Sequence, residues 1–214
     1  MKNARGMVCV MLLGILVAGG CATQGQKCDR LHPKKKDFAV AVVKLCNANG
    51  LGSLKVWVCV TPQPDVYNAW IDMTPVVYMS SGLLNEFADQ DVVMPIVAHE
   101  LSHYALQHIE KRAGASFGVT MLFTVAGVFI PGAGLGNLLV NPLVTNAYGR
   151  DQELDADKNA VKMLKNAGVE NAVDVYCTAL TVIIRKAGSD AKKWDLFAGH
   201  PPLEDRIKYV RSTE

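Results

Sequence analysis

The 214-residue sequence lacks an excess of either charge, a pair of cysteines in C-x-x-C spacing and any internal repeat. Lysine and arginine total 22 against 20 acidic residues, and this balance argues against a nucleic-acid-binding protein, which is normally basic. Without C-x-x-C, a cysteine zinc site or a thioredoxin-like redox motif has no support. Half of the residues are hydrophobic, which excludes a disordered chain and supplies material for one buried core.

Charge is also missing from residues 6–20, an apolar run that follows Lys2 and Arg5. A basic start, a short apolar stretch and small residues before a cut are typical of an export signal. The run has 15 residues, fewer than the roughly 20 that a spanning helix needs. It ends in Val-Ala-Gly-Gly-Cys at Cys21, which resembles the lipobox of bacterial lipoproteins, where this cysteine carries the lipid. A plain signal peptide beside an unrelated cysteine is the alternative.

This N-terminus divides the chain into a signal peptide at residues 1–20, a polar tether at 21–37 and a working domain at 38–214. Cys21 is followed by Ala22 and not by the aspartate that retains lipoproteins in the inner membrane of enteric bacteria. The resemblance therefore implies the periplasmic face of the outer membrane. The inner membrane and the soluble periplasm are the alternatives.

Four further cysteines remain after removal of the signal and lipidation of Cys21, and an oxidising compartment would allow them to pair. They are Cys28, Cys46, Cys59 and Cys177. Four cysteines allow three pairings, among which the sequence does not choose, and buried free thiols are the alternative.

Short β-type runs and longer helical patterns share the rest of the chain. Residues 55–60 and 76–80 are rich in valine and aromatic side chains and predict strands. Helices are predicted at 38–46, from Asp89 or Asp91 to Lys111 with Pro95 in the first turn, and at 150–167, 171–187 and 203–211. The pattern predicts one α+β domain, mostly helical, with a small sheet.

The strongest motif is H-E-x-x-H at residues 99–103, in the middle of a predicted helix. Positions i and i+4 share one helical face, so His99 and His103 can bind a single metal ion. Glu100 can then act as general base toward a water molecule at the metal.

A hydrolytic zinc site takes three protein ligands and keeps one position open. Glu153 and Asp157 lie four residues apart at the start of the predicted helix 150–167. This spacing suits one carboxylate as third ligand and a second that accepts the remaining N–H of a ligand histidine. Favourable placement of acidic groups at a helix start is the alternative explanation.

Three segments together resemble the HtpX-like zinc metallopeptidases, a gluzincin family that includes the CAAX prenyl endopeptidases. They are His-Glu-Leu-Ser-His at 99–103, Arg-x-x-Glu-x-x-Ala-Asp at 150–157 and His-Pro-Pro-Leu-Glu-Asp-Arg at 200–206. The signal and the short chain are similar to the periplasmic lipoprotein branch of that family. The resemblance implies a zincin-type fold and one Zn2+ per chain.

The family's functional residues map onto matching positions of this sequence. The resemblance implies His99, His103 and Glu153 as zinc ligands, Glu100 as base and Asp157 as the carboxylate behind a ligand. It also places His200 near the metal, where it would stabilise the oxyanion or block the site in a latent enzyme. Asn68 and Ala69 resemble the edge-strand segment that pairs with substrate backbone. His108, five positions after His103, is predicted to be structural, because about 500° of helical rotation takes it off the ligand face.

Residues 113–149 form a stretch of 37 positions without a single charge. Proline and glycine near position 131 interrupt it, which favours two short apolar helices over 115–147. Core packing is one interpretation, and an apolar lip that contacts a membrane surface or an unfolded substrate is another. A spanning segment, as in HtpX itself, is the third.

The sequence therefore predicts a zinc endopeptidase of the bacterial cell envelope, anchored through Cys21, that hydrolyses peptide bonds in misfolded or envelope proteins. The alternative is a catalytically latent lipoprotein that retains the metal and acts by binding or as a chaperone. The sequence defines neither the cleavage preference nor the oligomeric state.

Overall fold

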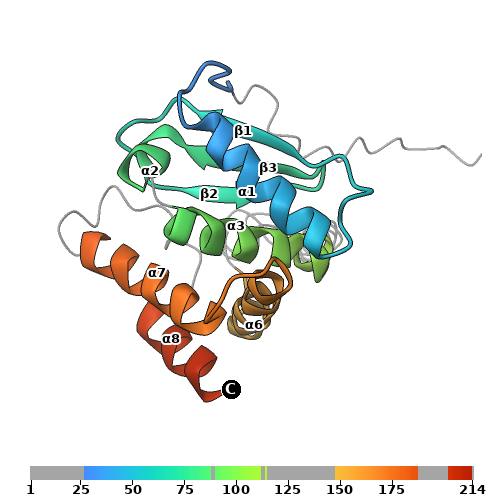
Figure 1. The fold of residues 1–214 in the computed structure, drawn as a ribbon, viewed down its shortest axis with the longest axis vertical. Helices are drawn as coiled ribbons and strands as arrows, with labels where there is room; N and C mark the ends of the chain where they lie inside the picture. The colour runs from blue at the N-terminus through green and yellow to red at the C-terminus, as the bar shows by residue number, and fades with distance from the viewer. Residues whose placement is uncertain (1–26, 88–89, 112–113, 115–147, 188–201, 214) are drawn as a thin grey trace, which may run out of the picture.

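The computed structural model describes residues 27–87, 90–111, 114, 148–187 and 202–213. In chain order its elements are α1 (Lys35–Ala48), β1 (Trp57–Thr61), β2 (Ala69–Ile71), β3 (Val76–Ser80), α2 (Ser81–Glu86), α3 (Gln90–Ala105), α6 (Arg150–Asn166), α7 (Ala172–Ala187) and α8 (Leu203–Ser212). Helices dominate and the strands form one small sheet, so the predicted α+β class is confirmed (Figure 1).

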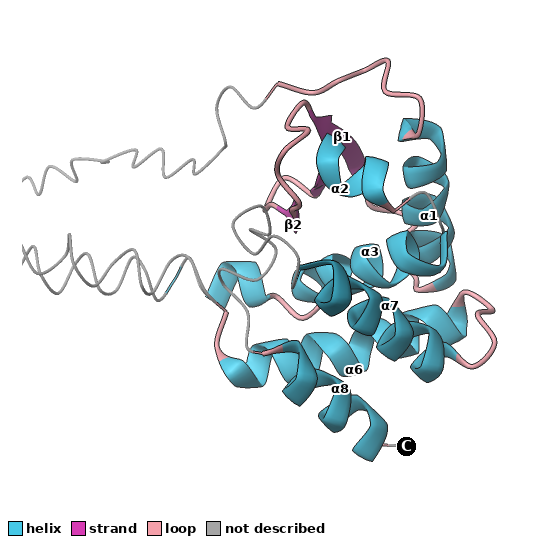
Figure 2. Cartoon of the chain, turned by 90° about the vertical axis from the view of Figure 1, so that its left-hand side faces the viewer, coloured by secondary structure: helices cyan, strands magenta, loops and turns pink. Residues whose placement is uncertain are grey.

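The sheet has the order β1-β3-β2, with β3 in the centre. β1 runs parallel to β3, with Trp57 opposite Val76, and β2 runs antiparallel to it, with Ala69 opposite Met79. Both predicted β-type runs are therefore strands, as expected for valine- and aromatic-rich segments. α1 lies across one face of the sheet, and α3 runs beside β2 (Figures 1 and 2).

Helix α3 occupies the middle of the molecule. Every residue from Val92 to His103 is buried, although three of these positions carry ionisable side chains. A helix that is apolar on all sides needs neighbours on all sides. α3 has α1 and the sheet on one side and α6 and α7 on the other (Figure 1). The motif of residues 99–103 is thus placed in the interior.

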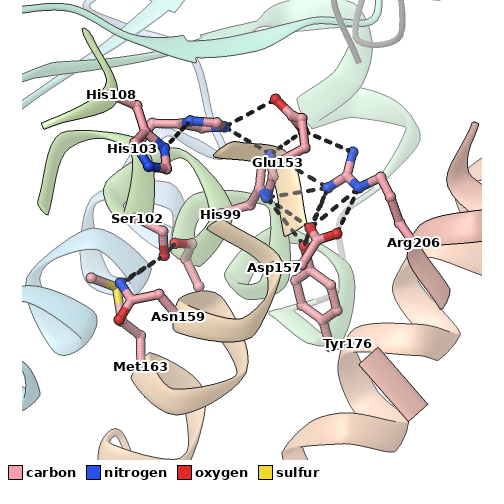
Figure 3. A network of polar contacts seen from close by, with 11 residues as sticks. His99, Ser102, His103, His108, Glu153, Asp157, Asn159, Met163, Tyr176 and Arg206 are labelled. Carbon is pink, nitrogen blue, oxygen red and sulfur yellow. Dashed lines mark hydrogen bonds and ion pairs between the residues drawn. The ribbon is translucent and has the colours of Figure 1, made fainter. Parts of the chain in front are cut away.

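Helices α3 and α6 are held together by a polar contact at Ser102, which is fully buried. Its hydroxyl donates to the carbonyl of Ala98 at 2.7 Å and accepts from Asn159 Nδ2 of α6 at 3.2 Å. The small side chain allows the two helices to approach closely, and the hydrogen bond fixes their relative position (Figure 3).

The predicted helix ending at Lys111 is wrong in its extent. α3 ends at Ala105, the chain turns at Leu106 and Gln107, and helical backbone resumes at His108. Gln107 adopts a φ of 58°, which an α-helix cannot contain. The sequence offered no glycine or proline here to mark the break.

The start of α3 also differs from the prediction. Gln90 and Asp91 are already helical, so Asp91 is not a cap, and the other candidate, Asp89, lies outside the described residues. Pro95 therefore falls in the second turn of α3 and not in the first.

The N-terminal segment joins the domain earlier than expected. Cys28 and Cys59 form a disulfide, and the amide of Asp29 donates to the carbonyl of Val60 at 2.7 Å. α1 already begins at Lys35. The tether predicted for residues 21–37 is therefore too long, because the covalent bond to β1 attaches the chain from Cys28 onward.

The remaining two cysteines, Cys46 and Cys177, are buried free thiols. Among the described helices, none is long and apolar enough to cross a membrane. The predicted signal peptide, Cys21 and the apolar helices expected at 115–147 lie outside the described residues.

Candidate active site

The two motif histidines project from one face of α3. His99 and His103 are four residues apart, and their Nε2 atoms lie 3.1 Å from each other. Both are buried, at 6% and 0% exposure. The helical spacing that suggested a shared metal therefore brings the two nitrogen atoms together.

Glu153 completes the group from α6, the helix packed against α3. Its Oε2 lies 3.4 Å from His99 Nε2, and its Oε1 lies 3.4 Å from His103 Nε2. The side chain is fully buried and sits in the first turn of α6. Figure 3 shows the three side chains turned toward one another from the two helices. The predicted ligand set thus forms one cluster of donor atoms.

These donor atoms fit a single divalent ion of the zinc type. Two atoms bound 2.0–2.1 Å from a zinc ion at the tetrahedral angle lie about 3.3–3.4 Å apart. The two Nε2 atoms are 3.1 Å apart, and each lies 3.4 Å from a different oxygen of the Glu153 carboxylate, so each separation is close to this value. Two imidazoles and one carboxylate also leave a fourth position for water or substrate, as hydrolytic sites require.

Glu100 follows His99 on α3 and is 3% exposed. It lines a pocket between α3, α7 and α8. The other lining residues are Pro95, Ile96, His99, Tyr176, Ala179, Leu180, Ile183, Leu203 and Arg206. The carboxylate therefore borders a mostly apolar pocket next to the donor cluster.

Asp157, one turn after Glu153 on α6, lies behind His99. Its Oδ1 is 3.1 Å from His99 Nδ1, the ring nitrogen that faces away from the donor cluster. When Nε2 binds a metal, Nδ1 carries the proton and donates it to this carboxylate. The structure places Asp157 where the spacing with Glu153 suggested.

Two buried residues that the sequence interpretation missed hold Asp157. Arg206 of α8 donates to both carboxylate oxygens, from Nε to Oδ2 at 2.9 Å and from Nη2 to Oδ1 at 2.6 Å. Its Nη1 also lies 3.5 Å from Glu153 Oε2. The hydroxyl of Tyr176, on α7, donates to Asp157 Oδ1 at 2.5 Å. Helices α6, α7 and α8 thus converge on the back of His99 (Figure 3).

The charges of this group are well defined. Burial opposes the charged form of Asp157, but the Arg206 guanidinium and the hydrogen bonds from His99 and Arg206 lower its pKa to about 2. Burial, together with the neighbouring carboxylate, raises the pKa of Tyr176 well above its usual value. Asp157 is therefore an anion at neutral pH, and Tyr176 is a neutral phenol that donates.

Comparison with known proteins assigns this arrangement. The sequence model of peptidase family M48 matches residues 34–214, most of the chain. The chain belongs to peptidase family M48. It is 24% identical to the metalloprotease LoiP of Escherichia coli (strain K12) over 191 residues, which cover 85% of this chain and 72% of LoiP. It is 24% identical to the metalloprotease YcaL of the same organism over 202 residues, which cover 90% of this chain and 76% of YcaL.

The M48 assignment confirms the resemblance noted from the three sequence segments and makes the protein a metalloprotease. A metal ion and a polypeptide substrate follow from that class. The clustered atoms of His99, His103 and Glu153 are the candidate ligands for this ion among the described residues.

His103 of this M48 chain has contacts of its own on the side away from His99. Its Nδ1 lies 3.1 Å from Nδ1 of His108, which is 2% exposed. The ring of Tyr148 stacks on the ring of His103, with centroids 3.7 Å apart and planes at 13°. The turn at Gln107 brings His108 back toward His103, which a continuous helix would not do. As predicted, His108 is not among the clustered ligand atoms of the described residues, but its contact with His103 did not follow from the sequence spacing.

Of the other predicted site residues of this M48 chain, two lie at β2 and two lie outside the described residues. Ala69 begins β2, the edge strand beside α3, and in the described part of the chain β2 pairs only with β3. Asn68 precedes it, and the backbone N–H of Asn68 donates to Ser80 Oγ at 2.9 Å. His200 and Cys21 lie outside the described residues.

Sequence signals for the missed residues were weak. Arg206 is the last residue of the segment 200–206 that carried the family resemblance, so that segment could have pointed to it. Tyr176 sits in an amphipathic helix, where a tyrosine is ordinarily part of the core.

Proposed function

We propose that this metalloprotease is a zinc endopeptidase of the bacterial cell envelope that hydrolyses peptide bonds in misfolded or envelope proteins. The observation that carries the proposal is the donor cluster. Nε2 of His99, Nε2 of His103 and the Glu153 carboxylate lie 3.1–3.4 Å from one another, beside the pocket that Glu100 lines.

His99, His103 and Glu153 would hold the ion. When bound, zinc lowers the pKa of a water molecule toward about 7 and polarises a peptide carbonyl. Among the residues that the structure describes, no cysteine joins this cluster, and a set of two histidines and one glutamate is typical of hydrolytic and not of structural zinc sites.

Glu100 moves the proton. Its carboxylate accepts a proton from the attacking water, whose oxygen adds to the carbonyl carbon of the substrate. The same carboxyl group then delivers the proton to the leaving amine nitrogen as the carbon–nitrogen bond breaks. Its burial in a mostly apolar pocket keeps bulk water away from this transfer.

Asp157, Arg206 and Tyr176 hold one ligand in place. The Asp157 carboxylate accepts the Nδ1–H of His99 and so keeps Nε2 free to bind the ion. Arg206 and Tyr176 in turn fix the carboxylate through three hydrogen bonds of 2.5–2.9 Å.

Substrate contacts complete the proposal. Ala69 and the preceding Asn68 would pair with the extended substrate backbone along β2, a position supported by the edge location of this strand beside α3. His200 would stabilise the oxyanion or, in a latent state, block the open ligand position.

The envelope location is part of the same proposal. The signal-like residues 1–20 and the lipobox-like Cys21 support export and a lipid anchor in the outer membrane, with the inner membrane or the soluble periplasm as alternatives. The Cys28–Cys59 disulfide is in keeping with an oxidising compartment. The apolar segment 115–147 is a second candidate membrane contact.

The test combines zinc content with cleavage of unfolded casein by the full chain. Wild type should contain one zinc ion per chain and produce internal fragments, and a chelator should abolish cleavage. Glu100→Gln should keep the zinc and lose about 10²–10⁴-fold in rate, the range for a positioned general base.

Glu110→Gln is the matched control, because it makes the same chemical change at an exposed position of the same chain segment. It should cleave as wild type does. Full activity of Glu100→Gln would overturn the mechanism. Zinc-loaded wild type that binds unfolded protein without cutting it would favour the latent binding or chaperone-like lipoprotein.

A further inference from the structure

The imidazole of His108 contacts the nitrogen of His103 that faces away from the donor cluster. The two Nδ1 atoms are 3.1 Å apart, and the rings meet edge to face at 63° with centroids 5.2 Å apart. Both side chains are buried, at 0% and 2% exposure. A nitrogen–nitrogen contact of this length is a hydrogen bond, so one of the two atoms carries the proton.

The direction of that hydrogen bond follows from the chemistry of ligation. A histidine that binds a metal through Nε2 uses the lone pair of that atom, and its proton must then reside on Nδ1. His103 Nδ1 is therefore the donor and His108 Nδ1 the acceptor, which requires His108 to be neutral with its proton on Nε2.

We propose that His108 is the positioning residue for His103: it accepts the Nδ1–H of His103 and so turns Nε2 of that ring toward the metal. The inference rests on the proposed function, because it takes His103 as a metal ligand. The two ligand histidines are thus oriented by different groups, His99 by the anionic Asp157 and His103 by a neutral imidazole.

The backbone around His108 supports this role. On a continuous helix, a residue five positions after His103 would face about 140° away from it. The left-handed conformation of Gln107, with φ 58°, ends α3 and returns the chain toward the His103 ring. Such a conformation is unfavourable in free energy for any residue other than glycine. Strained backbone of this kind is concentrated at functional sites.

The stacking of Tyr148 on His103 does not by itself select the orientation of the His103 ring. Tyr148 covers a face of the His103 ring at a centroid distance of 3.7 Å, while its own ring is 6.3 Å from that of His108. A stacked ring restricts tilting but allows the imidazole to flip by 180°, which would exchange its nitrogen positions. A partner in the ring plane distinguishes the two orientations, and at Nδ1 His108 provides such a partner.

The first experiment uses the wild-type full chain loaded with zinc. Long-range 1H–15N NMR spectra of the imidazoles distinguish protonated from unprotonated ring nitrogens. We expect a protonated Nδ1 in His103 and an unprotonated Nδ1 in His108. A protonated Nδ1 in His108 would overturn the proposal, whatever the behaviour of any variant.

The second experiment compares two replacements that separate packing from hydrogen bonding. His108→Phe keeps an aromatic ring and has no acceptor, whereas His108→Asn loses the ring and places Oδ1 near the position of Nδ1. Competition with a chromophoric chelator gives the zinc dissociation constant of each. We expect His108→Phe to bind zinc 10–100-fold more weakly than wild type, and His108→Asn to remain within about threefold.

The outcomes separate this proposal from the proposed function. Zinc affinity of His108→Phe equal to wild type, or of His108→Asn as weak as His108→Phe, overturns the role of His108 alone. A wild-type chain that binds no zinc overturns both the role of His108 and the proposed function. Far-ultraviolet circular dichroism checks that the variants fold, and the wild-type NMR result decides the matter if one does not.

Discussion

Arg206 and Asp157 form a buried two-point ion pair behind His99, with 2.9 Å from Nε to Oδ2 and 2.6 Å from Nη2 to Oδ1. Parallel hydrogen bonds of this kind fix the plane of a carboxylate as well as its position. Because Asp157 faces His99 Nδ1 at 3.1 Å, the orientation of the proposed ligand depends on a residue 107 positions further along the chain. The last described helix, α8, therefore contributes to the candidate active site.

Removing the arginine should destabilise the fold strongly. In Arg206→Met the Asp157 carboxylate is left buried without its cation, a change that typically costs about 3–5 kcal/mol. Urea unfolding at pH 7 measures the loss. Arg211→Met on the same helix is the control, because the Arg211–Asp174 pair at 3.0 Å is exposed on both sides and should contribute less than about 1 kcal/mol. Equal losses in the two variants would show that the buried pair has no special role.

The sequence predicted the parts of the site that lie within one helical turn. His99 and His103 share a face of α3 because of their i, i+4 spacing, and Glu153 and Asp157 share a face of α6 for the same reason. That these two faces would meet came from the family resemblance, since spacing within one helix says nothing about its neighbour.

The contacts that were not predicted depend on the packing of separate helices and on a turn that the sequence pattern does not mark. Tyr176 and Arg206 contact Asp157 from two separate helices, and a local sequence pattern does not predict contacts between helices. The turn at Gln107 has no glycine or proline, so the helical pattern was extended through it, and the contact between His108 and His103 was not predicted. The Cys28–Cys59 pairing likewise depends on β1 lying beside the N-terminal segment.

Tyr176→Phe should test the phenol separately from the ion pair. The variant loses the hydrogen bond to Asp157 Oδ1, and a hydrogen bond to a charged group contributes about 1.5–3 kcal/mol. We expect a loss of this size in urea unfolding, with metal still bound, since the contact from Asp157 to His99 remains. Tyr209→Phe is the control, because the Tyr209 hydroxyl makes no hydrogen bond to the residues that the structure describes, and should be nearly neutral.

Gly82 should not tolerate a side chain. A Cβ atom there would lie 2.4 Å from the carbonyl oxygen of Val66 and 2.6 Å from that of Pro64, so the backbone would have to move. We expect Gly82→Ala to lose about 1–3 kcal/mol in urea unfolding, the usual cost of overpacking. At Gly149 the nearest atom would be Gln152 Oε1 at 3.7 Å, so Gly149→Ala should be within about 0.5 kcal/mol of wild type. A stable Gly82→Ala variant would contradict the close contact between α2 and the loop that joins β1 to β2.

Metal affinity should rise with pH up to about 9. Burial and the Arg206 charge lower the pKa of His99, but hydrogen bonds to Asp157 and Glu153 outweigh them and raise it to about 9 in the metal-free chain. The metal requires the neutral imidazole, so below this pH each bound ion must displace a proton. One proton makes the apparent affinity fall about tenfold for each unit of decreasing pH, and the dependence levels off above 9.

Chelator competition between pH 6 and 10, with the titration of the chelator taken into account, measures this slope. Asp157→Asn removes a negative group that raises the pKa of His99, so the pH at which the affinity levels off should move down. The same substitution should also weaken binding about 10–100-fold at high pH, because the neutral amide supports the His99 ring less well. An affinity independent of pH between 6 and 9 in wild type would show that His99 is already neutral before the metal binds, and that Asp157 accepts the Nδ1–H of the ring without stabilising a second proton on it.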